Sequence, residues 1–184
     1  MQAIHLTAPF DSQVLKTLHA GDSVLVSGVI YTARDAAHGR MVQALKAGQP
    51  LPVDLRGQCV FYAGPTPTPP GKACGAIGPT TSVRMDPYTP TLLRCGVNAL
   101  IGKGDRGDAV ISALKETGGV YFAAAGGCAA VLCASVESVQ VLAYEDLGTE
   151  SVKRLIVKDL PLTVAVDSQG NDLYRMGRRS PDPE

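Results

Sequence analysis

Hydrophobic positions in the first third of the chain change from a strand-like to a helix-like spacing. Residues 22–33 are rich in valine, isoleucine and tyrosine, which favours a β-strand. Residues 34–47 place Ala37, Met41 and Leu45 at intervals of four, the spacing of a helix that buries one face. The pattern therefore predicts a strand followed at once by an amphipathic helix.

Turn-forming residues set the limits of these elements. Thr32 is a candidate N-cap for the first helix, and Gly48 and Pro50 would end it. Residues 64–71 contain four prolines, which lack the N–H that a helix or a central strand needs, so this segment is predicted as a stiff extended loop. Further strands are expected at 58–63, 97–101, 120–125, 136–144 and 155–166, with Pro161 between β-segments, and further helices at 90–95, 108–117 and 128–134.

The mixture of strands and helices predicts an α/β fold with a mixed sheet. The alternation of strand and helix is not regular, and the β-rich last third favours some antiparallel pairing. No internal repeat or linker divides the chain, so we expect one domain over residues 1–174. Residues 175–184 are charged and contain proline, which favours a flexible tail.

Composition excludes several classes of partner. The 184 residues are 45% hydrophobic, 17 basic residues balance 17 acidic ones, and aromatic residues make up only 5%. A nucleic-acid-binding surface needs a basic patch and stacking aromatics, so we expect no nucleic-acid partner. The N-terminus lacks a basic start and an apolar run, and no stretch is long enough to span a membrane. A soluble cytoplasmic protein is the default expectation.

Cysteine usage favours reduced, structural thiols. The five cysteines are an odd number, and no Cys-x-x-C spacing occurs. Zinc would want tighter pairs of ligands, so no metal site is predicted, although widely spaced ligands for an iron–sulfur cluster stay open on spacing alone. We expect each thiol to pack as a small hydrophobic group. The five positions are Cys59, Cys74, Cys95, Cys128 and Cys133.

The segment Gly-Pro-Thr-Thr-Ser-Val-Arg-Met at 78–85 is the strongest candidate for chemistry. If a helix begins here, Thr80 and Arg84 lie four residues apart and project from one face. A hydroxyl, a guanidinium and free N–H groups together form a seat for a carboxylate. The alternative is an ordinary capped helix with a solvated arginine.

Other cationic groups stand beside predicted turns, where ligands usually bind. Arg34 begins the first helix, His38 follows one turn later, and Lys103 lies between two glycines. Two arginine forks would fix both ends of a small diacid, which is a chemical reason for several cations without a compensating acidic cluster. Each cation taken alone is also compatible with a solvated side chain. His38 is interpreted as a helix-face residue or a support for the site rather than a base.

Four ordered motifs carry a resemblance to a known family. They are Gly-Val-Ile-Tyr-Thr-Ala-Arg-Asp-Ala-Ala-His at 28–38, Tyr-Ala-Gly-Pro at 62–65, Gly-Pro-Thr-Thr-Ser-Val-Arg-Met-Asp at 78–86 and Ile-Gly-Lys-Gly at 101–104. The chain resembles the β subunit, or C-terminal domain, of iron–sulfur hydro-lyases of the class I fumarase and L-tartrate dehydratase type. The resemblance extends over residues 21–174.

The resemblance implies a swivelling β/β/α-type domain and roles for individual residues. Arg34, Arg84 and Lys103 would bind the substrate carboxylates and hydroxyls. Thr80 would be the catalytic proton-transfer residue, with Thr81 beside it in the substrate-binding loop. The [4Fe–4S] cluster of the family would be ligated by a partner α subunit and not by this chain, and the expected assembly is a hetero-oligomer with two copies of each chain.

The resemblance also implies a reaction, the reversible hydration or dehydration of a small dicarboxylate. Fumarate and malate are the first expectation for the substrate and tartrate the next, with activity only in the presence of the α subunit. The alternative is a stand-alone dicarboxylate-binding or regulatory module that has no catalysis. A weaker third hypothesis is a structural chain that only stabilises its partner.

Overall fold

Seven strands form one mixed sheet in the computed structural model, which describes residues 3–177. The strands are β1 (Ile4–Ala8), β2 (Ser23–Thr32), β3 (Cys59–Phe61), β4 (Ala99–Gly102), β5 (Val120–Ala123), β6 (Val136–Ala143) and β7 (Val152–Val166). Strands β1 to β5 pair in parallel in chain order, whereas β7 runs antiparallel to β5, β6 and β2. Because β7 also pairs with β2, the circuit β2–β3–β4–β5–β7 closes on itself.

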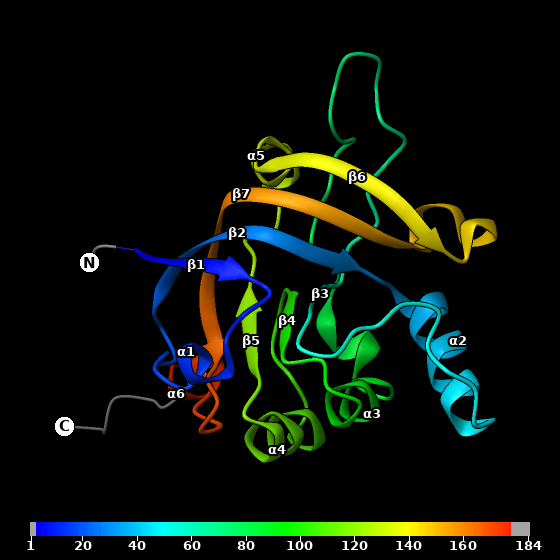
Figure 1. The fold of residues 1–184 in the computed structure, drawn as a ribbon. Helices are drawn as coiled ribbons and strands as arrows, with labels where there is room; N and C mark the ends of the chain where they lie inside the picture. The colour runs from blue at the N-terminus through cyan, green and yellow to red at the C-terminus, as the bar shows by residue number, and fades with distance from the viewer. Residues whose placement is uncertain (1–2, 178–184) are drawn as a thin grey trace.

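Helices lie on the outside of this closed sheet. They are α1 (Ser12–Leu15), α2 (Asp35–Lys46), α3 (Thr89–Arg94), α4 (Asp108–Thr117), α5 (Ala129–Ala134) and α6 (Leu173–Gly177), with 3₁₀ helices η1 (Ser82–Met85) and η2 (Glu145–Glu150). Figure 1 shows α3 and α4 side by side below the central strands, α2 at the lower right, and the long β7 bending across the top and down the left side. No helix among residues 3–177 is long and apolar enough to cross a membrane.

The core has two parts because successive strand residues point to opposite faces of the sheet. Phe61 and Phe122 lie in a cluster inside the closed sheet, whereas their neighbours Tyr62 and Tyr121 lie in a second cluster beneath α2, α3 and α4. All four of these rings are buried. Alternate residues along the same short strands therefore contribute side chains to both clusters.

The β1–β2 pair requires a glycine at one position. Gly28 has a positive φ of 103°, and a Cβ atom there would lie 2.2 Å from the carbonyl oxygen of Ala8. The strands can approach only without that side chain. The register of β2 against β7 also shifts between Val26 and Gly28.

The structure confirms the predicted α/β class and mixed sheet. The predicted helix at 108–117 has those bounds in the structure, and the β-rich last third forms the antiparallel strands β6 and β7. Strand β1 and helix α1 had no predicted counterpart. The predicted N-cap Thr32 is wrong, because Thr32 is the buried last residue of β2 and Arg34 occupies the cap position of α2.

Pro161 was also placed wrongly, since it lies inside β7 opposite Leu25 rather than between β-segments. At this position β7 has a neighbour on one side only, because its pairing with β6 ends at Val157 and that with β5 begins at Thr163. A residue without an N–H is tolerated where one edge of a strand is unpaired. In the predicted tail, residues 175–177 belong to α6, and residues 178–184 lie outside the described part of the chain.

Candidate active site

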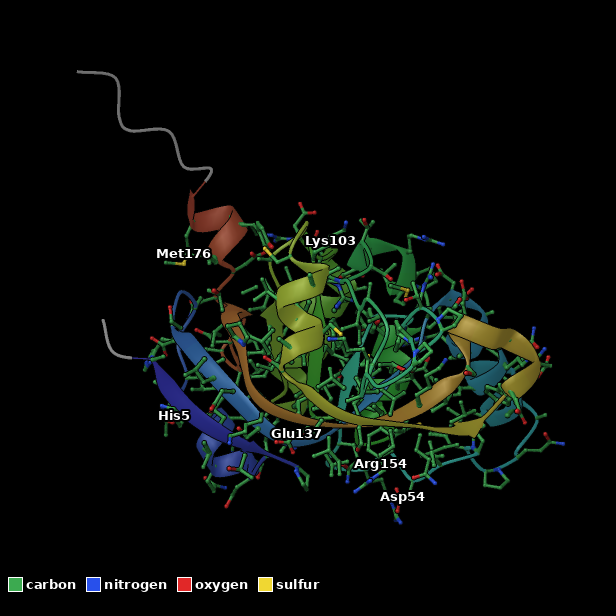
Figure 2. The ribbon with its side chains drawn as sticks, turned by 90° about the horizontal axis from the view of Figure 1, so that it is seen from above. His5, Asp54, Lys103, Glu137, Arg154 and Met176 are labelled. Carbon is green, nitrogen blue, oxygen red and sulfur yellow. The ribbon has the colours of Figure 1, made fainter. Side chains whose placement is uncertain are left out.

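The candidate site lies at one edge of the sheet, where parallel strands end. Strands β2, β3 and β4 run in the same direction, so the segments that follow them emerge together. Arg34 follows β2 and Lys103 follows β4. Figure 2 shows Lys103 near one rim of the molecule, far from Asp54 and Arg154 on the opposite rim.

Backbone pairing fixes the 78–85 segment against these strand ends. The N–H of Thr80 donates to the carbonyl oxygen of Tyr62 at 2.6 Å, and the N–H of Lys103 donates to that of Thr80 at 3.3 Å. Thr81 forms a parallel bridge with Lys103, whose carbonyl accepts from the N–H of Ser82 at 2.9 Å. The two threonines and the lysine are thus neighbours, although more than 20 positions separate them in the sequence.

The predicted helical relation between Thr80 and Arg84 is wrong. The helix in this segment is the 3₁₀ helix η1, which begins at Ser82 and carries Thr81 at its N-cap without a side-chain hydrogen bond. Thr80 precedes the helix in the backbone pairing described above, so the two residues do not share a helix face. The 3₁₀ turn instead links Arg84 to Thr81, the neighbour of Thr80, because the N–H of Arg84 donates to the carbonyl oxygen of Thr81 with an N–O distance of 3.4 Å.

An ion pair joins the predicted Arg84 to the residue that follows Arg34. Nε of Arg84 donates to Oδ1 of Asp35 at 3.0 Å, and Asp35 is the neighbour of Arg34 in the chain. The η1 helix therefore contacts the start of α2, where the Arg84 guanidinium is anchored next to Arg34 in the chain. The other carboxylate oxygen, Oδ2 of Asp35, is buried without a hydrogen-bond partner.

Glu150, which is distant from α2 in the sequence, binds the same end of this helix. Its Oε2 accepts from the N–H of Ala36 at 3.0 Å, and its Oε1 lies 3.3 Å from Nη2 of Arg34. The Glu150 carboxylate therefore caps the helix, the role predicted for Thr32, by accepting from a free N–H at the helix start. The expectation of cations without compensating acids is wrong as well, since Arg34 pairs with Glu150 and Arg84 with Asp35.

His38 supports this arrangement from inside. Its side chain is fully buried, and its ring packs edge-on against Tyr62 with the ring centroids 5.3 Å apart. Nδ1 lies 2.9 Å from the carbonyl oxygen of Arg34, which only accepts, so Nδ1 carries the proton and donates. Burial lowers the pKa of His38 from 6.5 to about 4 and keeps the ring neutral at pH 7.

A buried arginine that the sequence did not indicate lies beneath the site. Nε of Arg106 donates to Oδ1 of Asp86 at 2.8 Å, and Nη2 donates to the hydroxyl of Thr89 at 3.0 Å. The guanidinium also stacks on the rings of Tyr62 and Tyr121, at 5.2 and 4.9 Å from their centroids. Burial opposes the charge, but the nearby tyrosines and Asp86 outweigh it and raise the pKa of Arg106. Arg106 therefore ties the loop after β4 to the segment after η1.

A tyrosine next to this arginine fastens the same two loops. The hydroxyl of Tyr121 donates to the carbonyl oxygen of Gly104 at 2.8 Å and lies 2.9 Å from Oγ of Ser82. The Gly102 position is so crowded that a Cβ atom would lie 2.0 Å from that Oγ. The contacts of the Tyr121 hydroxyl therefore hold the backbone around Lys103 and Thr81 in place.

Comparison with known proteins identifies the family. A family profile described as "Fumarase C-terminus" matches residues 1–177, nearly the whole chain. This chain belongs to the fumarase C-terminus family. The resemblance drawn from the four motifs is therefore confirmed.

Relatives within this family carry the names of hydro-lyases, enzymes that add or remove water. The chain is 40% identical over 166 residues to "Putative L(+)-tartrate dehydratase subunit beta" of Methanocaldococcus jannaschii, covering 87% of this chain and 85% of that protein. It is 38% identical over 175 residues to "Fumarate hydratase 2" of Leishmania major, covering 93% of this chain and 31% of the relative. It is also 38% identical over 152 residues to "Fumarate hydratase class I, aerobic" of Escherichia coli K12, covering 82% and 28%. This family member thus spans under a third of each of these two fumarate hydratases.

The thiols of this fumarase C-terminus chain do not fit an iron–sulfur cluster. Cluster ligation needs several thiolates around one centre, but residues 3–177 contain no group of three His, Cys, Asp or Glu side chains able to hold a metal ion. Burial raises the pKa of the Cys74 thiol to about 12 and also raises that of Cys59, so both stay protonated. Both side chains are buried, and the other three cysteines are partly exposed.

Proposed function

We propose that this chain supplies the dicarboxylate-binding half of a hydro-lyase active site. The reaction is the reversible hydration of a small unsaturated dicarboxylate, with fumarate and malate the first candidates and tartrate the next. The observation that carries the proposal is the gathering of Arg34, Arg84, Thr80, Thr81 and Lys103 at one edge of the sheet in a family of hydro-lyases. The relatives named fumarate hydratase and tartrate dehydratase support this reaction class.

The cations would bind and orient the substrate. Arginine holds a carboxylate through two parallel hydrogen bonds, so Arg34 and Arg84 would hold the carboxylates of a dianion. Lys103 is a point charge that would contact a hydroxyl or a carboxylate oxygen of the substrate. Thr81, exposed beside Lys103, would add a hydroxyl contact. Fixing the diacid in this way lowers the entropy cost of the reaction step.

Thr80 would transfer the proton at the reacting carbon. An alcohol is a weak base at neutral pH and becomes a useful one only when nearby charge stabilises its deprotonated form. Lys103, which pairs with the Thr80–Thr81 segment through the backbone, and Arg84 in the following turn would supply that charge. A second acid or base would come from the partner.

The remaining parts of the site are assigned to a partner. We infer that an α subunit, or the equivalent domain of the longer relatives, holds the [4Fe–4S] cluster, because the thiols of this chain do not fit it. One relative is itself named a subunit beta, which supports a partner chain. Two copies of each chain are the proposed assembly.

The test is turnover by the chain assembled with its partner. We expect the purified complex, assayed without oxygen, to dehydrate malate or tartrate, and Arg84→Ala to lower kcat/KM roughly ten- to hundredfold because a charge-assisted hydrogen bond contributes about 1.5–3 kcal/mol. Arg94→Ala is the matched control, since Arg94 pairs with Glu116 between α3 and α4 and is half exposed. Equal kinetics for the two variants would contradict the proposal.

The alternative, a binding module without catalysis, predicts a different pattern. Calorimetric titration of the isolated chain with fumarate, malate and tartrate would then show tight binding in the absence of a partner. The assembled complex would also turn over no diacid. Thr80→Val provides a further distinction, because it should abolish turnover only if the hydroxyl takes part in the reaction.

A further inference from the structure

We propose that Asp35 is a positioning residue that orients the Arg84 guanidinium toward the dicarboxylate. The inference rests on the proposed function and deepens it, since it concerns how one carboxylate clamp of that site is aimed. Asp35 does not touch the substrate in this account. It acts through Arg84, 49 residues away in the sequence.

The geometry of the ion pair carries the inference. Asp35 binds Nε of Arg84 at 3.0 Å, so the bond uses the inner side of the guanidinium. The pair of terminal nitrogens at the tip, the fork that grips a carboxylate, is not used by Asp35. The Arg84 side chain is 52% exposed, whereas that of Asp35 is 27% exposed. A partly buried carboxylate thus holds the inner nitrogen of a guanidinium whose terminal nitrogens it leaves unused.

The anchor is itself rigid. Asp35 is the first residue of the 12-residue helix α2, where the helix dipole favours a negative charge. Glu150 binds the N–H of the next residue, Ala36, and pins this end of the helix. His38 binds the carbonyl oxygen of Arg34 on the other side of Asp35. The carboxylate that aims Arg84 is therefore fixed by contacts before and after it in the chain.

The pair differs from the surface ion pair between Arg94 and Glu116. Glu116 uses both carboxylate oxygens to bind Arg94, and both side chains are more than half exposed. Asp35 binds Arg84 through one oxygen, and its Oδ2 is buried without a partner, an arrangement that costs stability. The retained cost is consistent with a role in placing the arginine.

The experiment measures steady-state kinetics of the assembled enzyme with its partner. We expect Asp35→Ala to raise KM for the dicarboxylate about tenfold, the effect of losing one hydrogen bond to a charged group, with kcat changed less than KM. Asp35→Asn keeps an oxygen acceptor for Nε and should restore much of the loss. Glu116→Gln, which weakens the comparable bond to Arg94, should leave both constants unchanged.

A double-mutant cycle separates positioning from a merely structural role. In an Arg84→Ala background, Asp35→Ala should raise KM no further, because the residue it acts through is absent. An additional tenfold rise in that background would overturn the inference. So would an unchanged KM for Asp35→Ala in an enzyme in which Arg84→Ala raises KM.

The failure of the proposed function has its own signature. It appears as a wild-type complex that turns over no diacid, or as an Arg84→Ala variant with unchanged kinetics, and it overturns the inference as well. If Asp35→Ala fails to fold, as circular dichroism would reveal, the isosteric Asp35→Asn carries the test. In that case a KM for Asp35→Asn above that of the wild type, with no further rise in the Arg84→Ala background, supports the inference, and an unchanged KM overturns it.

Discussion

Lowering the pH should destabilise this protein through His38. The buried imidazole has its pKa lowered from 6.5 to about 4, chiefly by burial, with a smaller contribution in the same direction from Arg106. The hydrogen bond to the Arg34 carbonyl and the charge of Asp35 act in the opposite direction and are outweighed. Between these two pH values the unfolded chain binds a proton that the folded chain does not, so stability is lost as the pH falls.

The magnitude follows from the size of the shift. Each pKa unit corresponds to about 1.4 kcal/mol, so a shift of this size lowers the free energy of unfolding by about 3 kcal/mol from neutral pH to pH 4. About 2 kcal/mol of that is already lost at pH 5, because the unfolded imidazole is then almost fully protonated. This is a large part of the 5–15 kcal/mol that typically stabilises a domain.

The assay is urea unfolding of the wild type and of His38→Gln between pH 7.5 and pH 4.5. The variant should be less stable at neutral pH and should lose less stability on acidification, so the two curves converge at low pH. His19→Gln is the control, because the His19 side chain is 79% exposed. Parallel pH profiles for the wild type and His38→Gln would refute the account of a neutral histidine held by burial.

Two further substitutions test the support beneath the site. Arg106→Met should lower the free energy of unfolding by about 3–5 kcal/mol in urea titrations, because it leaves the carboxylate of Asp86 without its buried partner. Gly102→Ala should cost about 1–3 kcal/mol by driving a methyl group into Ser82, whereas Gly104→Ala meets open space and should cost about 1 kcal/mol for its positive φ alone. A smaller effect for Gly102 than for Gly104 would contradict the crowding described here.

Local signals explain what the sequence predicted well. Helix α4 has a periodic apolar face of Val110, Ala113 and Leu114, and Gly118 ends it in the left-handed conformation. Both signals lie within the segment itself, so its bounds could be read from the sequence. Arg34 and Lys103 were likewise indicated, because each follows a strand that was predicted correctly.

Long-range partners explain what the sequence could not predict. At the start of α2 the N–H of Ala36 donates to the carboxylate of Glu150, which lies 114 positions away in the sequence and belongs to η2. Nothing near Thr32 shows that its hydroxyl will be buried in the sheet instead. Arg106 stands in a glycine-rich loop typical of exposed charge, and its partners come from several other segments. Whether a charged side chain is buried depends on the assembled fold, so the local sequence pattern does not predict it.

Asp35→Ala acts on KM in two opposite directions, because Asp35 carries a negative charge and also holds the Arg84 side chain in place. Removing Asp35 leaves more positive charge near the substrate, which favours a dianion, but in water the Coulomb energy at about 7 Å is only about 0.6 kcal/mol. Freeing the Arg84 side chain costs up to about 2 kcal/mol of rotamer entropy when it must be ordered again by the substrate. Orientation therefore outweighs charge, and KM rises. Because salt screens only the Coulomb part, the ratio of KM between Asp35→Ala and the wild type should exceed one at low salt and grow with ionic strength, and a ratio below one at low salt would show that charge dominates.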